Sequence, residues 1–185
     1  MADFAPMVLT NAGLAIQTQA QAGAALKFSR IAIGDGARPA DFKVLDALVN
    51  EHQSTLPSEF EALDLGRARL RAVFNNRDLL AALEIRELGV FAIDPTDATE
   101  KLYTYTHAGA GYDTIPPGGG GSPVELVYDI HTLIGTAPNV SATLASNVYA
   151  SADALADLET RSEAAVAALL ALTAANTNER LKGIF

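Results

Sequence analysis

Residues 67–74 read RARLRAVF, a stretch in which arginine alternates with apolar side chains. A period of two is typical of a β-strand that has one face toward water and the other toward a core. We therefore expect a strand here. Its arginines share one face, and the other face carries Ala68, Leu70, Ala72 and Phe74.

Further segments on both sides of this stretch have the β-branched and aromatic composition of strands. They are residues 26–34, 84–93, 101–107, 124–135 and 139–145. In the first of them the apolar alternation changes phase between Phe28 and Ile31, which indicates either a bulge or burial on both faces. The turn Gly34-Asp35-Gly36 follows, and we expect the Asp35 side chain to bond to local amide groups.

Residues 10–23, TNAGLAIQTQAQAG, predict a helix near the N-terminus. Thr10 or Asn11 is suited to cap its first amide groups, and Gly23 is suited to end it. The helical spacing predicts a narrow buried face formed by Leu14, Ala15, Thr18 and Ala22.

Residues 151–181 are rich in alanine and leucine and contain no glycine or proline, which predicts a second helix. A 3–4 spacing aligns Leu155, Leu158, Leu169 and Leu172 with Asn176. Two arrangements fit this stripe. Three copies can form a parallel coiled coil in which Asn176 fixes the register, or the helix can pack on its own β domain.

These elements predict an α+β fold dominated by antiparallel strands. Residues 1–150 are expected to form the β-rich domain with its N-terminal helix. Residues 151–185 are expected to form a helical segment for oligomerisation or connection.

Composition excludes several classes of function. The chain has 185 residues and no cysteine, so it has no disulfides and no thiolate chemistry. Its formal net charge of −9 disfavours nucleic acid and anionic membranes as partners. We find no long apolar run and no basic leader followed by an apolar core, so we expect a protein made in the cytoplasm without membrane insertion.

Arg67, Arg69 and Arg71 form a basic stripe on an acidic protein. One hypothesis is that the stripe contacts an acidic surface of a partner protein. The alternative is the solvated face of an edge strand, where charge prevents pairing with other strands.

A second set of polar residues lies near a loop rich in glycine and proline, at 108–123. Tyrosine and histidine at such a place suit contact with a sugar or a protein, and ordinary packing is the alternative. The set consists of Tyr103, Tyr105, His107 and Tyr112.

No catalytic or metal-binding motif stands out, so we expect no enzyme activity, no cofactor and no metal. The run Gly118–Ser122 lacks the lysine and the helix of a phosphate-binding loop, which favours a flexible linker. The chain has no G-x-S-x-G elbow. Asp129 and His131 share a strand face, but no third metal ligand has a suggestive spacing.

Four segments in order carry a family resemblance. Residues 9–36 read LTNAGLAIQTQAQAGAALKFSRIAIGDG, with a T-x-A-G helix start and a strand that ends in GDG. Residues 85–94 read IRELGVFAID, which is similar to a strand of the form REvGLFd. Residues 103–117 and 126–144 read YTYTHAGAGYDTIPP and LVYDIHTLIGTAPNVSATL. Over residues 9–148 the chain resembles the N-terminal domain of phage tail-collar fibre proteins.

The resemblance implies a structural role in the virion tail. Such domains attach fibres to the baseplate of contractile tails and related injection machines, and the fibres are typically homotrimers. The expected partners are a baseplate wedge protein, copies of the chain itself, and a distal tail fibre or receptor-binding protein. A chain of 185 residues leaves no room for a host-binding tip, so we expect another chain to carry it.

Two other functions remain as alternatives. A receptor-binding protein that recognises a host surface glycan would cluster exposed aromatic residues, but only 6% of the residues are aromatic and tryptophan is missing. An enzyme that degrades capsule or wall polymer would need a cleft with two close acids.

Overall fold

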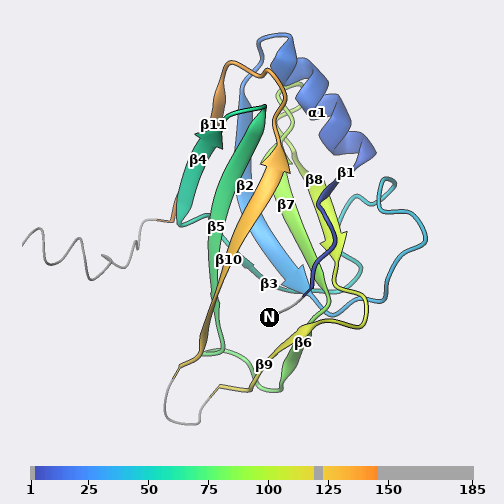
Figure 1. Ribbon diagram of the computed structural model, residues 1–185, viewed down its shortest axis with the longest axis vertical. Helices are drawn as coiled ribbons and strands as arrows, with labels where there is room; N and C mark the ends of the chain where they lie inside the picture. The colour runs from blue at the N-terminus through green and yellow to red at the C-terminus, as the bar shows by residue number, and fades with distance from the viewer. Residues whose placement is uncertain (1–2, 119–122, 146–185) are drawn as a thin grey trace, which may run out of the picture. The chain divides into compact units, whose positions relative to one another are not determined.

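The computed structural model describes residues 3–118 and 123–145, which lie in one compact unit that spans Met1–Ser146 (Figure 1). One helix and eleven strands make up this part of the chain. They are β1 (Val8–Leu9), α1 (Asn11–Gln21), β2 (Leu26–Gly34), β3 (Glu51–Thr55), β4 (Glu59–Leu63), β5 (Arg67–Asn75), β6 (Leu83–Ile85), β7 (Glu87–Ile93), β8 (Glu100–His107), β9 (Asp113–Ile115), β10 (Glu125–Leu133) and β11 (Val140–Ala142).

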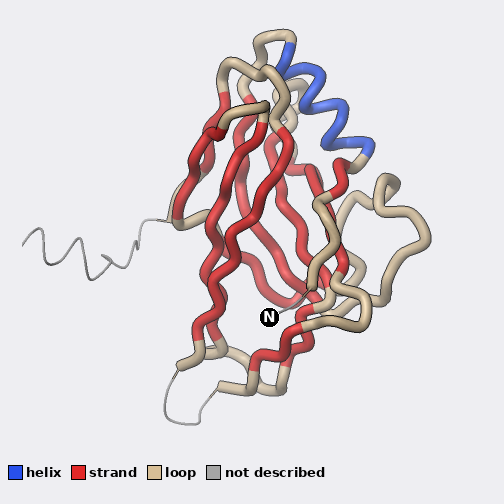
Figure 2. Tube along the Cα trace, viewed as in Figure 1, coloured by secondary structure: helices blue, strands red, loops and turns tan. Residues whose placement is uncertain are grey.

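The predicted α+β class is wrong. The described residues form mostly antiparallel sheets, with 45% strand and a single short helix that makes up 8%. Figure 2 shows how strands dominate this part of the trace. The sequence contains strong local helix signals, but α1 only covers one end of a core that the strands build between them. The helix expected at 151–181 lies outside the described residues.

The larger sheet has the strand order β1-β8-β7-β2-β11, and β3 also pairs with β2. All pairs are antiparallel except β11 with β2. The pairing of β2 with β7 shifts between Phe28 and Arg30, which is the predicted bulge. Residues 31–34 are buried, with Ala32 packed in a different cluster from Ile31 and Ile33, so burial on both faces is also confirmed.

The second sheet has the order β10-β5-β4, with β5 at its centre. The alternation predicted for β5 is confirmed, because its even-numbered apolar residues are buried and its arginines are not. β6 and β9 form a separate two-stranded ribbon. Figure 1 shows β5 and β10 in front of β2, β7 and β8, so the two main sheets are layered as a sandwich.

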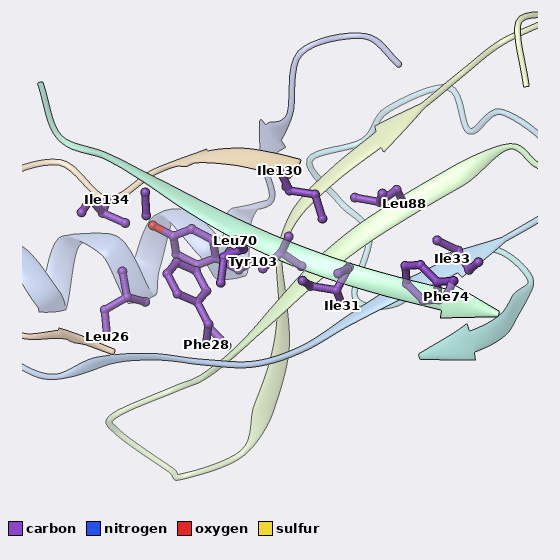
Figure 3. Close-up of a cluster of buried hydrophobic side chains, with 14 of the residues drawn as sticks. Leu26, Phe28, Ile31, Ile33, Leu70, Phe74, Leu88, Tyr103, Ile130 and Ile134 are labelled. Carbon is purple, nitrogen blue, oxygen red and sulfur yellow. The ribbon is translucent and has the colours of Figure 1, made fainter. Parts of the chain in front are cut away.

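The main core fills the space between these two sheets, and Figure 3 shows its side chains converging from both. Both sheets contribute apolar residues to this core, and α1 adds Ile16 and Ala20. The labelled members are Leu26, Phe28, Ile31, Ile33, Leu70, Phe74, Leu88, Tyr103, Ile130 and Ile134. A second, smaller cluster lies on the other face of the larger sheet, where Leu48, Phe42 and Leu45 of the 35–50 loop pack against it.

Thr10 caps α1 as predicted, because its hydroxyl oxygen accepts a hydrogen bond from Gly13 N at 2.9 Å. The same hydroxyl donates to the Leu102 carbonyl of β8. The predicted buried face of the helix is wrong, since Leu14 is 54% exposed. The buried residues are instead Gly13, Ile16, Gln17 and Ala20.

Gly13 explains which face of α1 is buried. A Cβ at this position would overlap the carbonyl oxygen of Tyr103, so only glycine allows the helix to lie this close to β8. The close backbone approach at Gly13, together with the burial of Ile16 and Ala20, therefore sets the orientation of the helix.

Candidate functional site

The GDG turn, the 35–50 loop and β7 meet at the carboxylate of Glu87, which is fully buried. Its Oε1 accepts hydrogen bonds from Asn50 N at 2.7 Å and Gly36 N at 3.1 Å. Its Oε2 accepts from Val49 N and from the Tyr105 hydroxyl, each at 2.9 Å. All four partners donate, which matches the acceptor-only chemistry of a carboxylate.

The two glycines of the GDG turn make this arrangement possible. A Cβ on Gly36 would overlap Glu87 Oε1, and a Cβ on Gly34 would overlap the carbonyl oxygen of Asn50. The turn can therefore close over the carboxylate only because both positions lack a side chain. Asp35, between them, does not hold local amides as expected. It accepts from Asn50 Nδ2 at 2.7 Å and lies 3.0 Å from His52 Nε2.

His107 completes the same buried cluster and is 4% exposed. Its Nδ1 accepts from Gly109 N at 2.9 Å, so Nε2 carries the proton and donates to the Gly36 carbonyl at 3.1 Å. Both ring nitrogens are thus used to fix the backbone. His107 and Glu87 pair across β8 and β7, so they anchor the turn from neighbouring strands.

The tyrosines considered for ligand contact are placed differently from one another. Tyr103 and Tyr105 are fully buried, and the Tyr103 hydroxyl donates to the Leu133 carbonyl at 2.6 Å. Burial raises the pKa of both tyrosines. Tyr112 is half-buried under the Arg86 guanidinium, which lies 4.1 Å from the ring centroid. The structure therefore brings Tyr105 and His107 together around Glu87, as parts of the scaffold rather than as an exposed platform.

The arginine stripe of β5 does not lie on an edge strand, so that interpretation is wrong. β4 and β10 flank it and supply acids to it. Arg71 donates to Asp129 from Nε at 2.9 Å and from Nη2 at 3.1 Å, and it also donates to Glu59 at 3.0 Å. These hydrogen bonds from Arg71 lower the pKa of Asp129 below that of an ordinary carboxyl group.

Arg69 is held in the same way. Its Nη2 lies 2.9 Å from Glu61 Oε2 and its Nη1 lies 3.7 Å from Asp129 Oδ1. These acidic residues of the same chain neutralise much of the charge of the stripe. Arg67, at the end of the stripe, is exposed and lies opposite Leu63 and Leu133. The acidic surface expected on a partner is thus partly supplied by the chain itself.

A groove of about 230 Å³ lies between the N-terminal segment and β10. Residues 4–7 line one side, residues 128–131 line the other, and Leu88 and Thr106 also contribute. Among the described residues, Asp129 is the only acid that lines the groove, and Arg71 already binds that carboxylate. The paired carboxylates of a glycosidase are therefore not built into this groove.

Within residues 3–118 and 123–145, no group of three or more histidine, cysteine or acidic side chains gathers to hold a metal. No helix in the same part of the chain is long and apolar enough to cross a membrane. The arrangement offers buried hydrogen-bond anchors and a charge-paired outer sheet face, which are features of a scaffold.

Several predicted residues lie outside the part of the chain that the structure describes. These are Leu155, Leu158, Leu169, Leu172, Asn176 and most of the 118–122 glycine run. The sequence interpretation also missed Glu87. The signal for it was a charged residue at the start of ELGVFAI, an otherwise apolar strand, where an acid must find donors.

Comparisons with family models, with curated proteins and with solved structures give no match for this chain.

Proposed function

We propose that this chain is a structural protein of a phage-type contractile tail, which attaches a fibre to the baseplate. The proposal is supported by the contacts that the family-like motifs of this chain make with one another inside the fold. Thr10 and Gly13 of the T-x-A-G start lie against Leu102 and Tyr103 of β8. The GDG turn closes on Glu87 of the RELG strand.

Assembly is the mechanism that these features favour. The buried carboxylate, the capped helix and the charge ladder on β5 hold the surface in a fixed shape, which reduces the entropy lost when a large partner binds. A baseplate wedge protein on one side and a distal fibre or receptor-binding protein on the other would then gain affinity from several contacts at once.

Direct recognition of a host glycan has weaker support. Tyr103 and Tyr105, two of the aromatic residues on which that alternative depended, are fully buried. Tyr112 is half-buried and its ring face is occupied by Arg86. No sugar-stacking platform results from this set of residues.

Immunogold labelling of tail particles from the producing strain, with antibody against this chain, tests the proposal. Gold at the distal end of the tail is the expected result. Absence from intact particles, while a known tail protein is labelled in the same preparation, would refute the adaptor function.

A complementation experiment extends the test with two variants chosen as a matched pair from the structure. A strain that lacks the gene should regain fibred, infective or injection-competent particles with the wild-type chain. Leu14→Ala should also restore them, because Leu14 is exposed on α1. Gly13→Val, one position away, should not restore them, because its side chain would collide with the Tyr103 carbonyl. Full recovery without fibres on the particles would count against the proposal.

A further inference from the structure

The outer edge of β10 is a long strand edge without a partner strand among residues 3–118 and 123–145. β10 pairs with β5 over nine consecutive residue pairs, from Glu125 with Asn75 to Leu133 with Arg67. It ends the order β10-β5-β4, so its other edge has no strand beside it in this sheet. Unpaired strand edges present N–H and C=O groups that can bind another strand.

The hydrogen bonds at both ends of β10 show which residues direct their backbone groups outward. Ile134 N donates to the Gly66 carbonyl at 2.8 Å, and Asn76 N donates to the Val124 carbonyl at 3.3 Å. The N–H and C=O groups of the even-numbered residues of β10 therefore point toward β5. In an antiparallel ladder the alternate residues face the other way.

The backbone groups of odd-numbered residues point away from the strand pair, as this alternation requires. Arg71, opposite Asp129, uses its carbonyl to accept from Ser58 N beside β4, and Leu133 uses its carbonyl to accept from Tyr103. Val127, Asp129 and His131 thus direct their N–H and C=O groups to the open edge.

This edge lacks the protections that strand edges usually have. Between Glu125 and Leu133 there is no proline and no lysine, and the register with β5 is continuous, without a bulge. The N-terminal segment approaches β10 through side chains, with the Phe4 ring 5.9 Å from that of Tyr128. Tyr128 belongs to the inner face, so this contact leaves the outer face of β10 exposed. Along the edge itself, the groove of about 230 Å³ separates residues 4–7 from residues 128–131, so the second strand would enter this groove.

The outer face of β10 is complementary to itself. Val127 and Leu133 are 51% and 50% exposed, and Asp129 and His131 lie exposed between them. We infer that two copies of the chain pair through β10, antiparallel and two-fold symmetric about Ile130. This register sets Asp129 opposite His131 of the second copy and Val127 opposite its Leu133.

Each of these facing pairs is favourable. The imidazole of His131 can donate a hydrogen bond to the carboxylate of Asp129, which has acceptor positions beyond those that Arg71 uses. Val127 and Leu133 would cover each other's apolar surface. Any other two-fold register that keeps the same alternation moves one of these matches. Centring on Asp129, for example, would place two carboxylates opposite each other.

This inference goes beyond the proposed function and does not depend on it. It also differs from the three-copy arrangement that the resemblance implies, because a strand edge pairs with a single neighbour and a two-fold contact does not close a three-fold ring.

Sedimentation equilibrium of the full-length chain tests the inference, over a wide range of protein concentrations. The wild type should associate as a dimer. His131→Pro removes an outward N–H and blocks the edge without touching the β5 ladder, so this variant should be monomeric at the same concentrations. His131→Glu turns two favourable pairs into repulsive ones and should weaken the dimer about tenfold or more.

His131→Gln is the matched control. It keeps the backbone N–H and a neutral side-chain N–H donor opposite Asp129, so the dimer should persist. Thermal melts followed by circular dichroism show whether each variant folds. If His131→Pro does not fold, His131→Glu decides the question, because its new carboxylate lies opposite Arg69 within the same chain. A wild type that is monomeric or trimeric throughout, or a folded His131→Glu that dimerises as tightly as the wild type, would overturn the inference.

Discussion

Removal of the Glu87 carboxylate should destabilise the protein more than any other single change of a charged side chain in the described part of the structure. Glu87→Ala leaves four donors without an acceptor. The bonds from Gly36 and Tyr105 are buried, whereas those from Val49 and Asn50 are part-buried, so water can replace some of the latter. At about 1–3 kcal/mol for each orphaned buried donor, we expect a loss of about 3–5 kcal/mol.

Glu87→Gln is the sharper variant because it preserves shape. Its amide nitrogen must replace one carboxylate oxygen, and there it would face either the Gly36 and Asn50 amides or the Val49 amide and the Tyr105 hydroxyl. Donor would meet donor in both orientations. We expect a loss of about 2–3 kcal/mol, a substantial part of the roughly 5–15 kcal/mol that stabilises an ordinary domain.

Urea unfolding measures these losses. The chain has no tryptophan, so far-ultraviolet circular dichroism is the appropriate signal. Glu84→Gln is the matched control, since Glu84 is a partly exposed acid that pairs with the partly exposed Arg86 side chain. Its effect should stay within about 0.5 kcal/mol, as for most surface changes. A Glu87→Gln variant that unfolds at the same urea concentration as Glu84→Gln, with an unchanged slope, would refute the anchoring role of the carboxylate.

Three further predictions concern other parts of the sandwich. Leu65 is 87% exposed at φ 63°, so Leu65→Gly should relieve left-handed strain and raise the free energy of unfolding by about 1 kcal/mol in the same urea assay; no gain would contradict the strain argument. Tyr103 and Tyr105 have raised pKa values in the folded state. Their contribution to the free energy of unfolding is therefore complete below the unfolded-state pKa near 10 and is lost as pH rises above that value. A stability profile that stays flat through alkaline pH would exclude this linkage. Asp129 has a lowered pKa because of Arg71, so its contribution is present above pH ~4 and is lost on acidification; Asp129→Asn should flatten that part of the acid profile, and an unchanged profile would show that the pair adds nothing.

Local pattern was sufficient to predict those elements whose environment repeats along the chain. β5 alternates because each of its faces keeps one environment over its whole length, so the residues of RARLRAVF could be assigned to faces from the sequence alone. The bulge in β2 was predictable for the same reason, since the extra residue of a bulge shifts the phase of the alternation, here between Phe28 and Ile31. The Thr10 cap is likewise a local interaction, with Gly13 three residues away.

Contacts between distant segments were not predictable in this way. Helical spacing led to the wrong buried face for α1, because the face that is buried depends on Gly13 meeting Tyr103, which is ninety residues further along the chain. For Tyr105 and His107 the sequence left ligand contact and ordinary packing open, and the structure shows packing, with Glu87 and Gly36 as their partners. A buried polar group can be recognised only when its partner is known.

The contacts made by the family-like motifs show what the resemblance can indicate about this protein and what it cannot. Three residues of these motifs make contacts within the fold. Gly13 lies against β8, Gly36 donates a hydrogen bond to Glu87, and Glu87 accepts a hydrogen bond from the 35–50 loop. Residues with such roles constrain the scaffold and carry little information about a partner. The choice of partner must therefore depend on exposed positions that do not take part in these contacts. The open edge at Val127, Asp129 and His131 lies within the resembling segment 126–144 but outside its packed positions, and it is there that changes should alter assembly while the fold stays intact.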